Sequence, residues 1–512
     1  MGLAKVYSGG VAGVEAFEVE IEASARMGDP ALYVVGLPDA AVRESKDRVW
    51  TAIGNSHLFF NPSHMTVNLA PADVRKEGAS FDLPIALSIL LATDALKPNA
   101  NPGAYMALGE LALSGAVRRV RGVLPIAIMA RKRGFKGLLV PAENAAEAAV
   151  VDGLDVHAIA NLREAVDFLE GKIEIPPTKV DLASLFDTQL HCADDFSEVK
   201  GQALARRALE VAVSGGHGVL MIGSPGCGKS LMARRIPSIL PPMTLEEALE
   251  TTQIHSVAGA LSPRQSLLTQ RPFRAPHHTA SDVGLLGGGM HLSPGEVSLA
   301  HGGVLFLDEL PEFPRNVLEV LRQPLEDGHV TITRASGSVT FPSRFMLVAA
   351  MNPCPCGYAG DPKRACRCLP LRVQAYRDKI SGPLLDRIDI HINVPSVHFQ
   401  QMSGAAPAET SATIRGRVVA SRARQTERFG PGGPVCNAHM KPRDTHKHCV
   451  LTPACSTLLK MAMEEMGLTG RAYDRILKVA RTIADMDASA DIAEEHLQEA
   501  ISYRTLDRVK WS

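Results

Sequence analysis

The stretch Gly223–Ser230 reads GSPGCGKS and decides the fold of the middle of the chain. It fits the pattern G-x-x-x-x-G-K-[ST]. The apolar run 217–223 before it predicts a buried strand, and residues 231–236 after it predict a helix. A strand, a glycine loop and a helix in this order are the context of a phosphate-binding P-loop. Glycines let backbone N–H groups turn inward around phosphates, and the helix N-terminus favours negative charge.

The loop predicts ATP and Mg²⁺ as cofactors. Lys229 should reach the β- and γ-phosphates, and Ser230 should bind Mg²⁺. A chance match in a glycine-rich turn is the alternative, and the flanking strand and helix disfavour it. The loop residues expected to bind nucleotide are Gly223, Ser224, Pro225, Gly226, Cys227, Gly228, Lys229 and Ser230.

A P-loop needs an acidic partner to hydrolyse ATP, and the apolar strand 304–309 ends in two carboxylates. Asp308 is expected to hold Mg²⁺ through water, and Glu309 to polarise the attacking water. An acidic strand end in solvent is the simpler interpretation. The next apolar strand ends at Asn352, whose amide can orient the lytic water, although alone it would pass for a turn residue.

Bulk properties restrict the class of protein. The chain has 512 residues, enough for two to four domains, with 46% hydrophobic and 21% charged residues and a net charge of −1. Any contact with nucleic acid must therefore use local basic patches. No apolar run reaches about 18 residues, so we expect no membrane span. The N-terminus lacks the apolar segment of a signal peptide. Nine cysteines, one of them in the P-loop, indicate a reducing, cytoplasmic location.

Residues 1–170 predict a first α/β domain, because strands alternate with helices. The expected strands are 17–22, 31–36, 65–70 and 137–140, and the expected helices are 40–55 and 83–95. A linker is expected over 171–195, an ATPase core over 196–395, a second linker over 396–410 and a helical domain over 411–512.

The first domain resembles the proteolytic domain of the Lon family through Lys76–Ser80, the loop that carries the nucleophilic serine there. By that resemblance the partner lysine falls after Gly115–Gly122, near Leu124, which cannot act as a base. A serine without its lysine is not activated, so we expect a protease-like fold without protease activity, serving assembly or DNA guidance. The basic residues of this region are compatible with either role, or with a solvated face: Arg118, Arg119, Arg121, Arg131, Lys132 and Arg133.

Two further segments lie around the acidic strand. Residues 271–279 carry Arg271, Arg274, His277 and His278 and run into a glycine-rich stretch. These side chains are expected to contact phosphates from a mobile loop, with a metal site at the two histidines as the weaker alternative. After the acidic strand, residues 329–334 and 338–341 alternate around a Ser-Gly turn and predict a β-hairpin.

Four cysteines form a compact cluster after Asn352. Cys354, Cys356, Cys366 and Cys368 give the spacing C-x-C-x₉-C-x-C, which fits a tetrahedral Zn²⁺ site although C-x-C is tighter than usual. Redox-active or unligated thiols are the alternatives. Basic residues around the cluster suit DNA phosphates.

These motifs together resemble the magnesium-chelatase branch of AAA+ ATPases. Joined to a Lon-like first half, they are similar to the ComM/YifB family over essentially the whole chain. The resemblance implies an α/β fold with a Lon protease-like domain, an AAA+ P-loop core and a C-terminal helical lid. It also implies a hexameric DNA helicase that promotes branch migration of recombination intermediates, notably in natural transformation, with single-stranded and branched DNA as partners.

The same resemblance assigns further residues. Gln202 is expected to contact adenine, although it could simply begin a helix. Arg387 takes the role of an arginine finger toward a neighbouring subunit, with a surface ion pair as the alternative. Arg471 is expected to act as the sensor arginine of the lid, with Arg475 as the alternative. The residues expected to contact DNA are Arg334 at the hairpin tip and Lys363, Arg364 and Arg367 in the cysteine cluster.

Two other functions compete with a DNA motor. A metal-chelatase subunit would use the same ATPase to act through a partner protein, and the first domain and the cysteine cluster disfavour it. An ATP-dependent protease would require Ser80 as nucleophile, and the missing lysine disfavours it.

Overall fold

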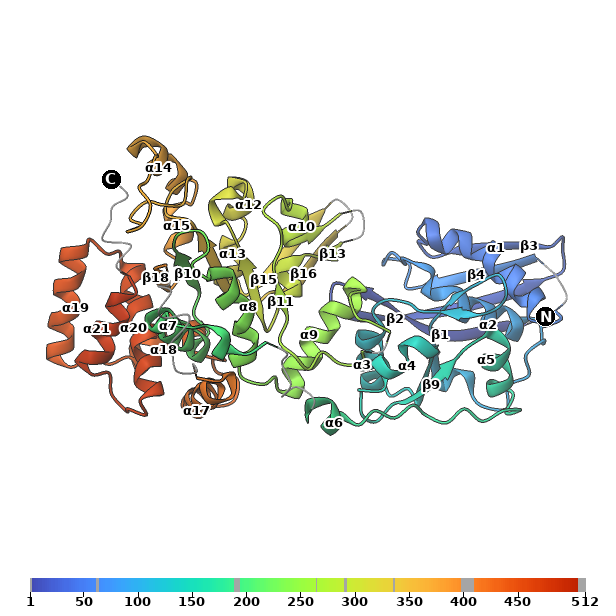
Figure 1. Cartoon of the computed structure of the whole chain (residues 1–512). Coiled ribbons are helices and arrows are strands. Elements are labelled where there is room, and N and C mark those ends of the chain that lie inside the picture. Colours follow the sequence, from blue (N-terminus) through green and yellow to red (C-terminus); the bar gives the residue numbers. More distant parts are fainter. Residues whose placement is uncertain are drawn as a thin grey trace.

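The computed structural model describes residues 2–60, 64–187, 194–263, 265–289, 292–334, 337–396 and 409–504. Figure 1 shows an N-terminal domain at one end of the molecule, a helical lid at the other and the P-loop core between them. The mixed α/β fold class is confirmed. Within the described ranges, no helix combines the length and apolar character that crossing a bilayer requires.

The N-terminal domain is built on a seven-stranded mixed sheet in the order β3-β4-β2-β1-β5-β8-β9. In β2 the side chains of Val19, Ile21 and Ala23 are fully buried, as the alternating pattern predicts. The strands are β1 (Leu3–Ala12), β2 (Glu15–Arg26), β3 (Ala31–Val35), β4 (His64–Ala70), β5 (Tyr105–Ala107), β8 (Gly137–Pro141) and β9 (Asp155–Ile159), with the small hairpin β6 (Glu110–Leu111) and β7 (Val117–Arg118). The helices are α1 (Ala40–Asn55), α2 (Asp82–Ala92), α3 (Val123–Arg133), α4 (Ala145–Ala148) and α5 (Leu162–Leu169).

The loop that resembles the Lon serine loop is folded back on itself. Lys76 is fully buried and its Nζ donates to the carbonyl of Pro71. Burial lowers the pKa of Lys76. Ser80 lies half-buried in the single 3-10 turn Ala79–Phe81 that precedes α2, and Leu124 is fully buried in α3. The relation to Lon proteases and the absence of protease activity stay predictions.

The N-terminal domain and the core share a joint at α9 (Leu245–Ala258). One hydrophobic cluster joins residues of α3 to Met243, Ala248 and Leu267 of the core. At its edge, Arg119 donates to the carbonyl of Leu261 at 2.6 Å. A Cβ on Gly259 would lie 2.6 Å from Arg121 Nε. Arg119 therefore belongs to the joint between domains, while Arg121 lies beside Gly259 and stays exposed.

A second contact joins the two domains at the tip of the β1–β2 hairpin. A Cβ on Gly13 would lie 2.7 Å from Val339 Cγ1. Val14 packs against the hydrophobic cluster of the core beneath it. The predicted linker 171–195 also contributes, since it contains a short helix, α6 (Leu182–Asp187), and Leu185 packs on the shared cluster.

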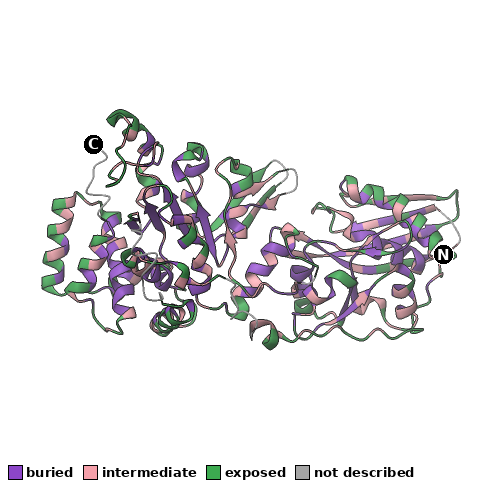
Figure 2. Cartoon of the chain, in the orientation of Figure 1, coloured by how far each residue is buried: buried purple, intermediate pink, exposed green. Residues whose placement is uncertain are grey.

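The core is a five-stranded parallel sheet in the order β11-β14-β17-β10-β18, and Figure 2 shows its central strands buried. The strands are β11 (Phe273–Arg274), β14 (Val304–Leu307), β17 (Met346–Met351), β10 (Val219–Ile222) and β18 (Ile390–Asn393). Carboxyl ends of parallel strands meet at one edge of a sheet. The P-loop after β10, Asp308 after β14 and Asn352 after β17 are therefore neighbours.

Short helices surround this sheet, and two hairpins lie to one side of it (Figure 1). The helices are α7 (Ala203–Gly215), α8 (Lys229–Ile239), α10 (Asp282–Leu286), α11 (Glu296–Leu299), α12 (Arg315–Glu319), α13 (Arg322–Asp327), α14 (Pro370–Arg377) and α15 (Gly382–Leu385). The hairpins are β12 (Gly287–Gly288) with β13 (Ser293–Pro294), and β15 (His329–Arg334) with β16 (Gly337–Pro342). The longer hairpin was predicted; its turn residues 335–336 lie outside the described residues.

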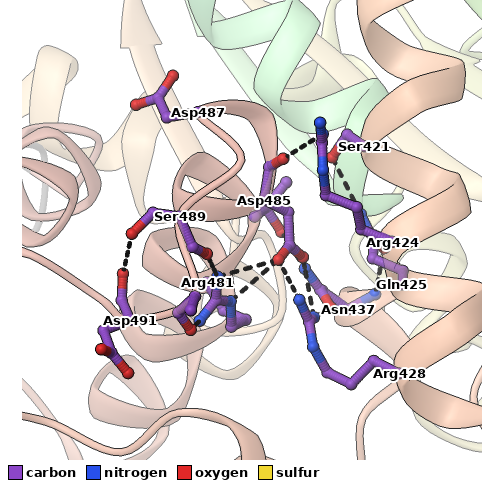
Figure 3. A network of polar contacts seen from close by, with 12 residues as sticks. Ser421, Arg424, Gln425, Arg428, Asn437, Arg481, Asp485, Asp487, Ser489 and Asp491 are labelled. Carbon is purple, nitrogen blue, oxygen red and sulfur yellow. Dashed lines mark hydrogen bonds and ion pairs between the residues drawn. The ribbon is translucent and has the colours of Figure 1, made fainter.

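The lid is a bundle of helices that an ionic network joins to α7. Its elements are α17 (Ser411–Phe429), η7 (Asn437–His439), α18 (Pro442–His448), α19 (Pro453–Met466), α20 (Gly470–Met486) and α21 (Glu494–Ser502). Figure 3 shows the buried carboxylate of Asp485 facing Arg428, Arg481 and Asn437. Gln425 extends the network to the Ser214 carbonyl of α7 at 2.9 Å. The predicted linker 396–410 lies almost wholly outside the described residues.

Candidate nucleotide site and cysteine cluster

The P-loop encloses the side chain of Lys229. Its Nζ donates to the carbonyls of Gly223 at 2.6 Å and Ser224 at 3.1 Å, and to Asn352 Oδ1 at 3.3 Å. Gly226 and Gly228 have left-handed φ values of 79° and 95°, which L side chains rarely adopt. These turns aim the start of α8 into the loop, where backbone N–H groups and the helix N-terminus suit phosphate.

The predicted acidic residue Asp308 lies beside the P-loop. Ser230 Oγ donates to Asp308 Oδ2 at 2.6 Å, so the hydroxyl and carboxylate expected to share Mg²⁺ are adjacent. Glu309 has a left-handed φ of 53° and an exposed carboxylate. The structure thus brings together Lys229, Ser230, Asp308 and Asn352 as the sequence predicted, with Glu309 next to them in the chain.

The residues present fit a nucleotide with Mg²⁺. Gln202 Nε2 donates to the carbonyls of Cys227 at 3.4 Å and Pro395 at 2.5 Å, which places the amide beside the P-loop. Its buried Oε1 has no hydrogen-bond partner among the residues that the structure describes. A buried acceptor of this kind is costly unless a ligand donor satisfies it. The exocyclic amine of adenine supplies such a donor, as the predicted role of Gln202 requires.

One functional contact was missed by the sequence analysis. His278 Nδ1 lies 3.4 Å from Glu309 Oε2. The ring also meets Phe313 edge-on, with centroids 6.4 Å apart, and stacks near His277. The histidine was expected to reach phosphates or a metal; the structure places its ring beside the predicted catalytic carboxylate, and the phosphate contact stays a prediction. Its position just after β11, the strand beside β14, was the available signal.

The predicted arginine finger is held within its own subunit. Arg387 is 6% exposed, forms an ion pair with Glu326, and donates to the Pro383 carbonyl at 2.6 Å. Contact with a neighbouring subunit would require its release from Glu326. Its role in a ring stays a prediction.

The two lid arginines have different surroundings. Arg471 is exposed at the first turn of α20. It lies close enough to Arg387 for its positive charge to lower the pKa of Arg387, in addition to the larger effect of burial. Arg475, the alternative sensor, is paired with the buried carboxylate of Asp389. His217 approaches the same carboxylate at 3.0 Å. Arg475 therefore fastens the lid to the core, and Arg471 remains the predicted sensor.

The strand beside this pair carries a buried imidazole that makes stability depend on pH. Burial lowers the pKa of His391 to about 3 from an ordinary value of 6.5. The folded protein therefore keeps it neutral, while the unfolded chain takes up a proton below pH 6.5. Stability should fall as pH decreases through this window, by about 2 kcal/mol at pH 5 from this residue.

Urea unfolding of the wild type and His391→Gln at pH 7 and pH 5 measures this contribution. The wild type should lose more stability on acidification than the variant does. Asp389 does not interfere, because although burial opposes its ionisation, Arg475 and His217 hold its pKa below the ordinary 3.8. Equal losses in the two proteins would contradict the assignment.

The four predicted cysteines converge. Sγ of Cys354 lies 3.4 Å from Sγ of Cys356 and 3.6 Å from Sγ of Cys366. Together with Cys368, all four sulfurs lie within 4.8 Å of one another. Tetrahedral zinc with Zn–S bonds of about 2.3 Å requires sulfurs about 3.8 Å apart. Within the described ranges this is the one group of histidine, cysteine and acidic residues with such geometry, and Cys436 and His439 form only a pair.

The predicted DNA-contacting residues are exposed on two different elements. Arg334 ends β15, beside the hairpin turn. Lys363, Arg364 and Arg367 lie on the surface of the cysteine segment. Arg364 donates to Tyr358 Oη at 2.7 Å and stacks over that ring. Exposure is what a DNA contact requires, and the contact itself stays a prediction.

Comparisons with known proteins agree with this geometry. Three family models match: "Subunit ChlI of Mg-chelatase" over residues 19–144, "Magnesium chelatase, subunit ChlI" over 195–402, and "Magnesium chelatase, subunit ChlI C-terminal" over 408–504. Uncharacterized protein YifB of Salmonella typhimurium is 43% identical, over 99% of this chain and 98% of that protein. Competence protein ComM of Haemophilus influenzae is 42% identical, over 99% of each. The chain belongs to the ComM/YifB family.

This ComM/YifB family member shares less with a chelatase subunit. The magnesium-chelatase 38 kDa subunit of Cereibacter sphaeroides is 27% identical over 31% of this chain and 52% of that protein. The family and the site geometry make the chain a magnesium-chelatase-like AAA+ ATPase. The N-terminal domain matches a magnesium-chelatase model, while its likeness to Lon proteases stays a prediction.

Proposed function

We propose that the chain is an ATP-driven DNA helicase that promotes branch migration of recombination intermediates as a hexameric ring of identical subunits in the cytoplasm. Its DNA partners are single-stranded and branched, and its setting is natural transformation. The observation that carries the proposal is the β15–β16 hairpin, which ends in exposed Arg334 and leads directly into β17 and Asn352. A basic hairpin joined to the γ-phosphate side of the site can couple hydrolysis to movement along a nucleic-acid backbone.

Two further observations support this function. The relative of nearly equal length from Haemophilus influenzae is named a competence protein. Arg471 is close enough to lower the pKa of Arg387, so the two arginines expected to sense the γ-phosphate lie on one side of the chain, where a neighbouring subunit could present its nucleotide to them. The ring would release Arg387 from Glu326 when a neighbour's nucleotide arrives.

The four cysteines are proposed to hold a structural Zn²⁺. Thiolate ligands in tetrahedral geometry favour this ion. A backbone N–H of Cys368 favours the Cys366 thiolate, yet burial and the neighbouring sulfurs raise the pKa of Cys366 to about 12. A divalent cation removes this conflict, because it stabilises all four thiolates together.

The alternative is a chelatase-like subunit that acts through a partner protein, as the matching family models would allow. ATP-dependent movement of a synthetic four-way DNA junction separates the two functions. The wild type should move the branch only with ATP, and DNA should raise its ATPase rate. Lys229→Ala should abolish both activities by removing the contact to the phosphates.

A hairpin variant provides the sharper arm of this experiment. Arg334→Ala should keep basal ATPase and lose DNA stimulation and branch movement. Lys460→Ala is the matched control, because this lysine is 77% exposed on a lid helix far from the hairpin in sequence. ATP hydrolysis that ignores DNA, with no branch movement by the wild type, would refute the motor and favour the chelatase-like function.

A further inference from the structure

The cysteine segment, residues 354–368, lies against the P-loop. It begins two residues after Asn352, and its first turn places Gly357 on Pro225. A Cβ on Gly357 would lie 2.6 Å from both Cγ and Cδ of Pro225, and the φ of Gly357 is 87°. Ser224 and Pro225, which form the outer turn of the P-loop, therefore rest directly on the cysteine segment.

The side chains of Asp361 and Ser224 make the second contact. The Ser224 hydroxyl favours the charged form of the carboxylate and is the largest of the causes that lower the pKa of Asp361. The same carboxylate accepts from the backbone N–H groups of Lys363 at 2.8 Å and Arg364 at 3.1 Å. Asp361 is thus fixed by the turn that brings the second cysteine pair to the first. On the other side of this contact, the Ser224 carbonyl accepts from Lys229.

The helix that follows the cysteine segment, α14, contacts the residues at which the segment begins. Arg377 Nε of α14 donates to the Pro353 carbonyl at 3.2 Å. Tyr376 hydrogen-bonds with the backbone of Asn352. Every residue from 352 to 369 is described, and none of them lies in a helix or strand. A loop of this length without a core of its own needs another constraint to hold one shape, and a metal is the usual one.

We propose that the metal held by the four cysteines keeps the P-loop in its nucleotide-binding conformation, with Asp361 as the positioning residue between them. Metal and nucleotide then bind cooperatively. This inference rests on the zinc site proposed above and is independent of DNA translocation. Coupling between two sites is reciprocal, so each ligand must raise the affinity for the other by the same factor.

A pair of glycine variants tests the contact with the P-loop. Gly357→Ala collides with Pro225, whereas a Cβ on Gly360 meets nothing within 4 Å. Both glycines have left-handed φ values, 87° and 77°, so the backbone strain is matched. Both variants should retain one Zn²⁺ per chain. Gly357→Ala should weaken binding of a fluorescent ATP analogue about tenfold, and Gly360→Ala should change it less than twofold.

Asp361 variants test this second contact. Asp361→Ala should weaken nucleotide binding about tenfold, and Asp361→Asn should recover most of the affinity because its Oδ1 still accepts from the backbone N–H groups of Lys363 and Arg364 and so keeps the turn beside Ser224. Asp378→Ala, at the exposed end of α14, is the control and should bind as the wild type does. Equal affinities in Asp361→Ala and Asp378→Ala would overturn the positioning role.

Reciprocity gives a test that needs no variant. The affinity of the wild type for Zn²⁺ is measured by competition with a chromogenic chelator that ignores Mg²⁺, with and without a non-hydrolysable ATP analogue. The analogue should raise the affinity for Zn²⁺ about tenfold. An unchanged affinity, a protein that binds no zinc, or equal nucleotide binding by the two glycine variants would overturn the proposal. No arm contains DNA, so failure of the junction assay alone would refute only the motor.

Discussion

Glu309→Gln is expected to lower the steady-state rate of ATP hydrolysis by about 10³-fold while ATP still binds. The amide cannot take a proton from the attacking water, so the chemical step loses its general base. Binding should survive because Lys229, Ser230 and Asp308 make their contacts independently of Glu309. Phosphate release measures the rate, and a fluorescent ATP analogue measures the affinity.

Glu312→Gln is the matched control for this result. Glu312 lies three residues further on, follows the same strand, and pairs with Lys379 at 3.5 Å at the surface. Its loss should leave the rate within about twofold, as for an ordinary exposed ion pair. If Glu309→Gln hydrolysed ATP within threefold of the wild type, another residue would have to activate the water. His278 would then be only a structural neighbour of Glu309.

Asp485→Ala is expected to destabilise the lid by about 3–5 kcal/mol. The carboxylate is 1% exposed and accepts from Arg428 at 2.9 Å, Arg481 at 3.1 Å and Asn437 at 2.8 Å (Figure 3). Removing it leaves two guanidinium groups near each other without their shared counter-charge. The two arginines then repel each other and remain partly buried without a negative partner. The hydrogen bond from Gln425 to α7 should weaken as a consequence.

Asp487→Ala supplies the comparison, because this carboxylate is two residues away and half exposed. It approaches His496 at 3.4 Å and should contribute less than about 1 kcal/mol. The helical signal in urea, followed by circular dichroism, reports the transition of each variant. Equal shifts for Asp485→Ala and Asp487→Ala would show that the network in Figure 3 adds nothing beyond surface charge.

The parts of the fold that follow from local pattern were predicted well. The helix expected over 40–55 is α1 with the same bounds, since an apolar stripe and an Asp39 cap mark it. The segment 314–326 is helical but does not form one continuous helix. The chain forms α12 and α13 with a break at Val320–Leu321, and Pro324 lies in the first turn of α13, where a missing N–H costs nothing.

The nucleotide site also has one part that the sequence predicts and another part that it does not. The P-loop, the strand-end acids and Asn352 converge because parallel strands bring their carboxyl ends to one edge, which order along the chain alone indicates. The approach of His278 to Glu309 and of Asp361 to Ser224 depends on how separate loops fold over that edge. No periodicity encodes such contacts. The contact of Arg119 was not predicted for a related reason, since a basic run does not reveal which of its members meets a carbonyl of another domain.

The contact between Gly13 and Val339 ties the hairpin to the first domain as well as to the ATPase core. A swing of the hairpin larger than a side-chain width must either carry the first domain with it or separate the two surfaces. In the proposed motor, the N-terminal domain would therefore act as a mechanical load on each movement of the hairpin. Removing the residues before 194 would free the hairpin from this domain. The same truncation would expose the apolar surface around Met243 and Leu267 to water, so the remaining ATPase fragment should aggregate.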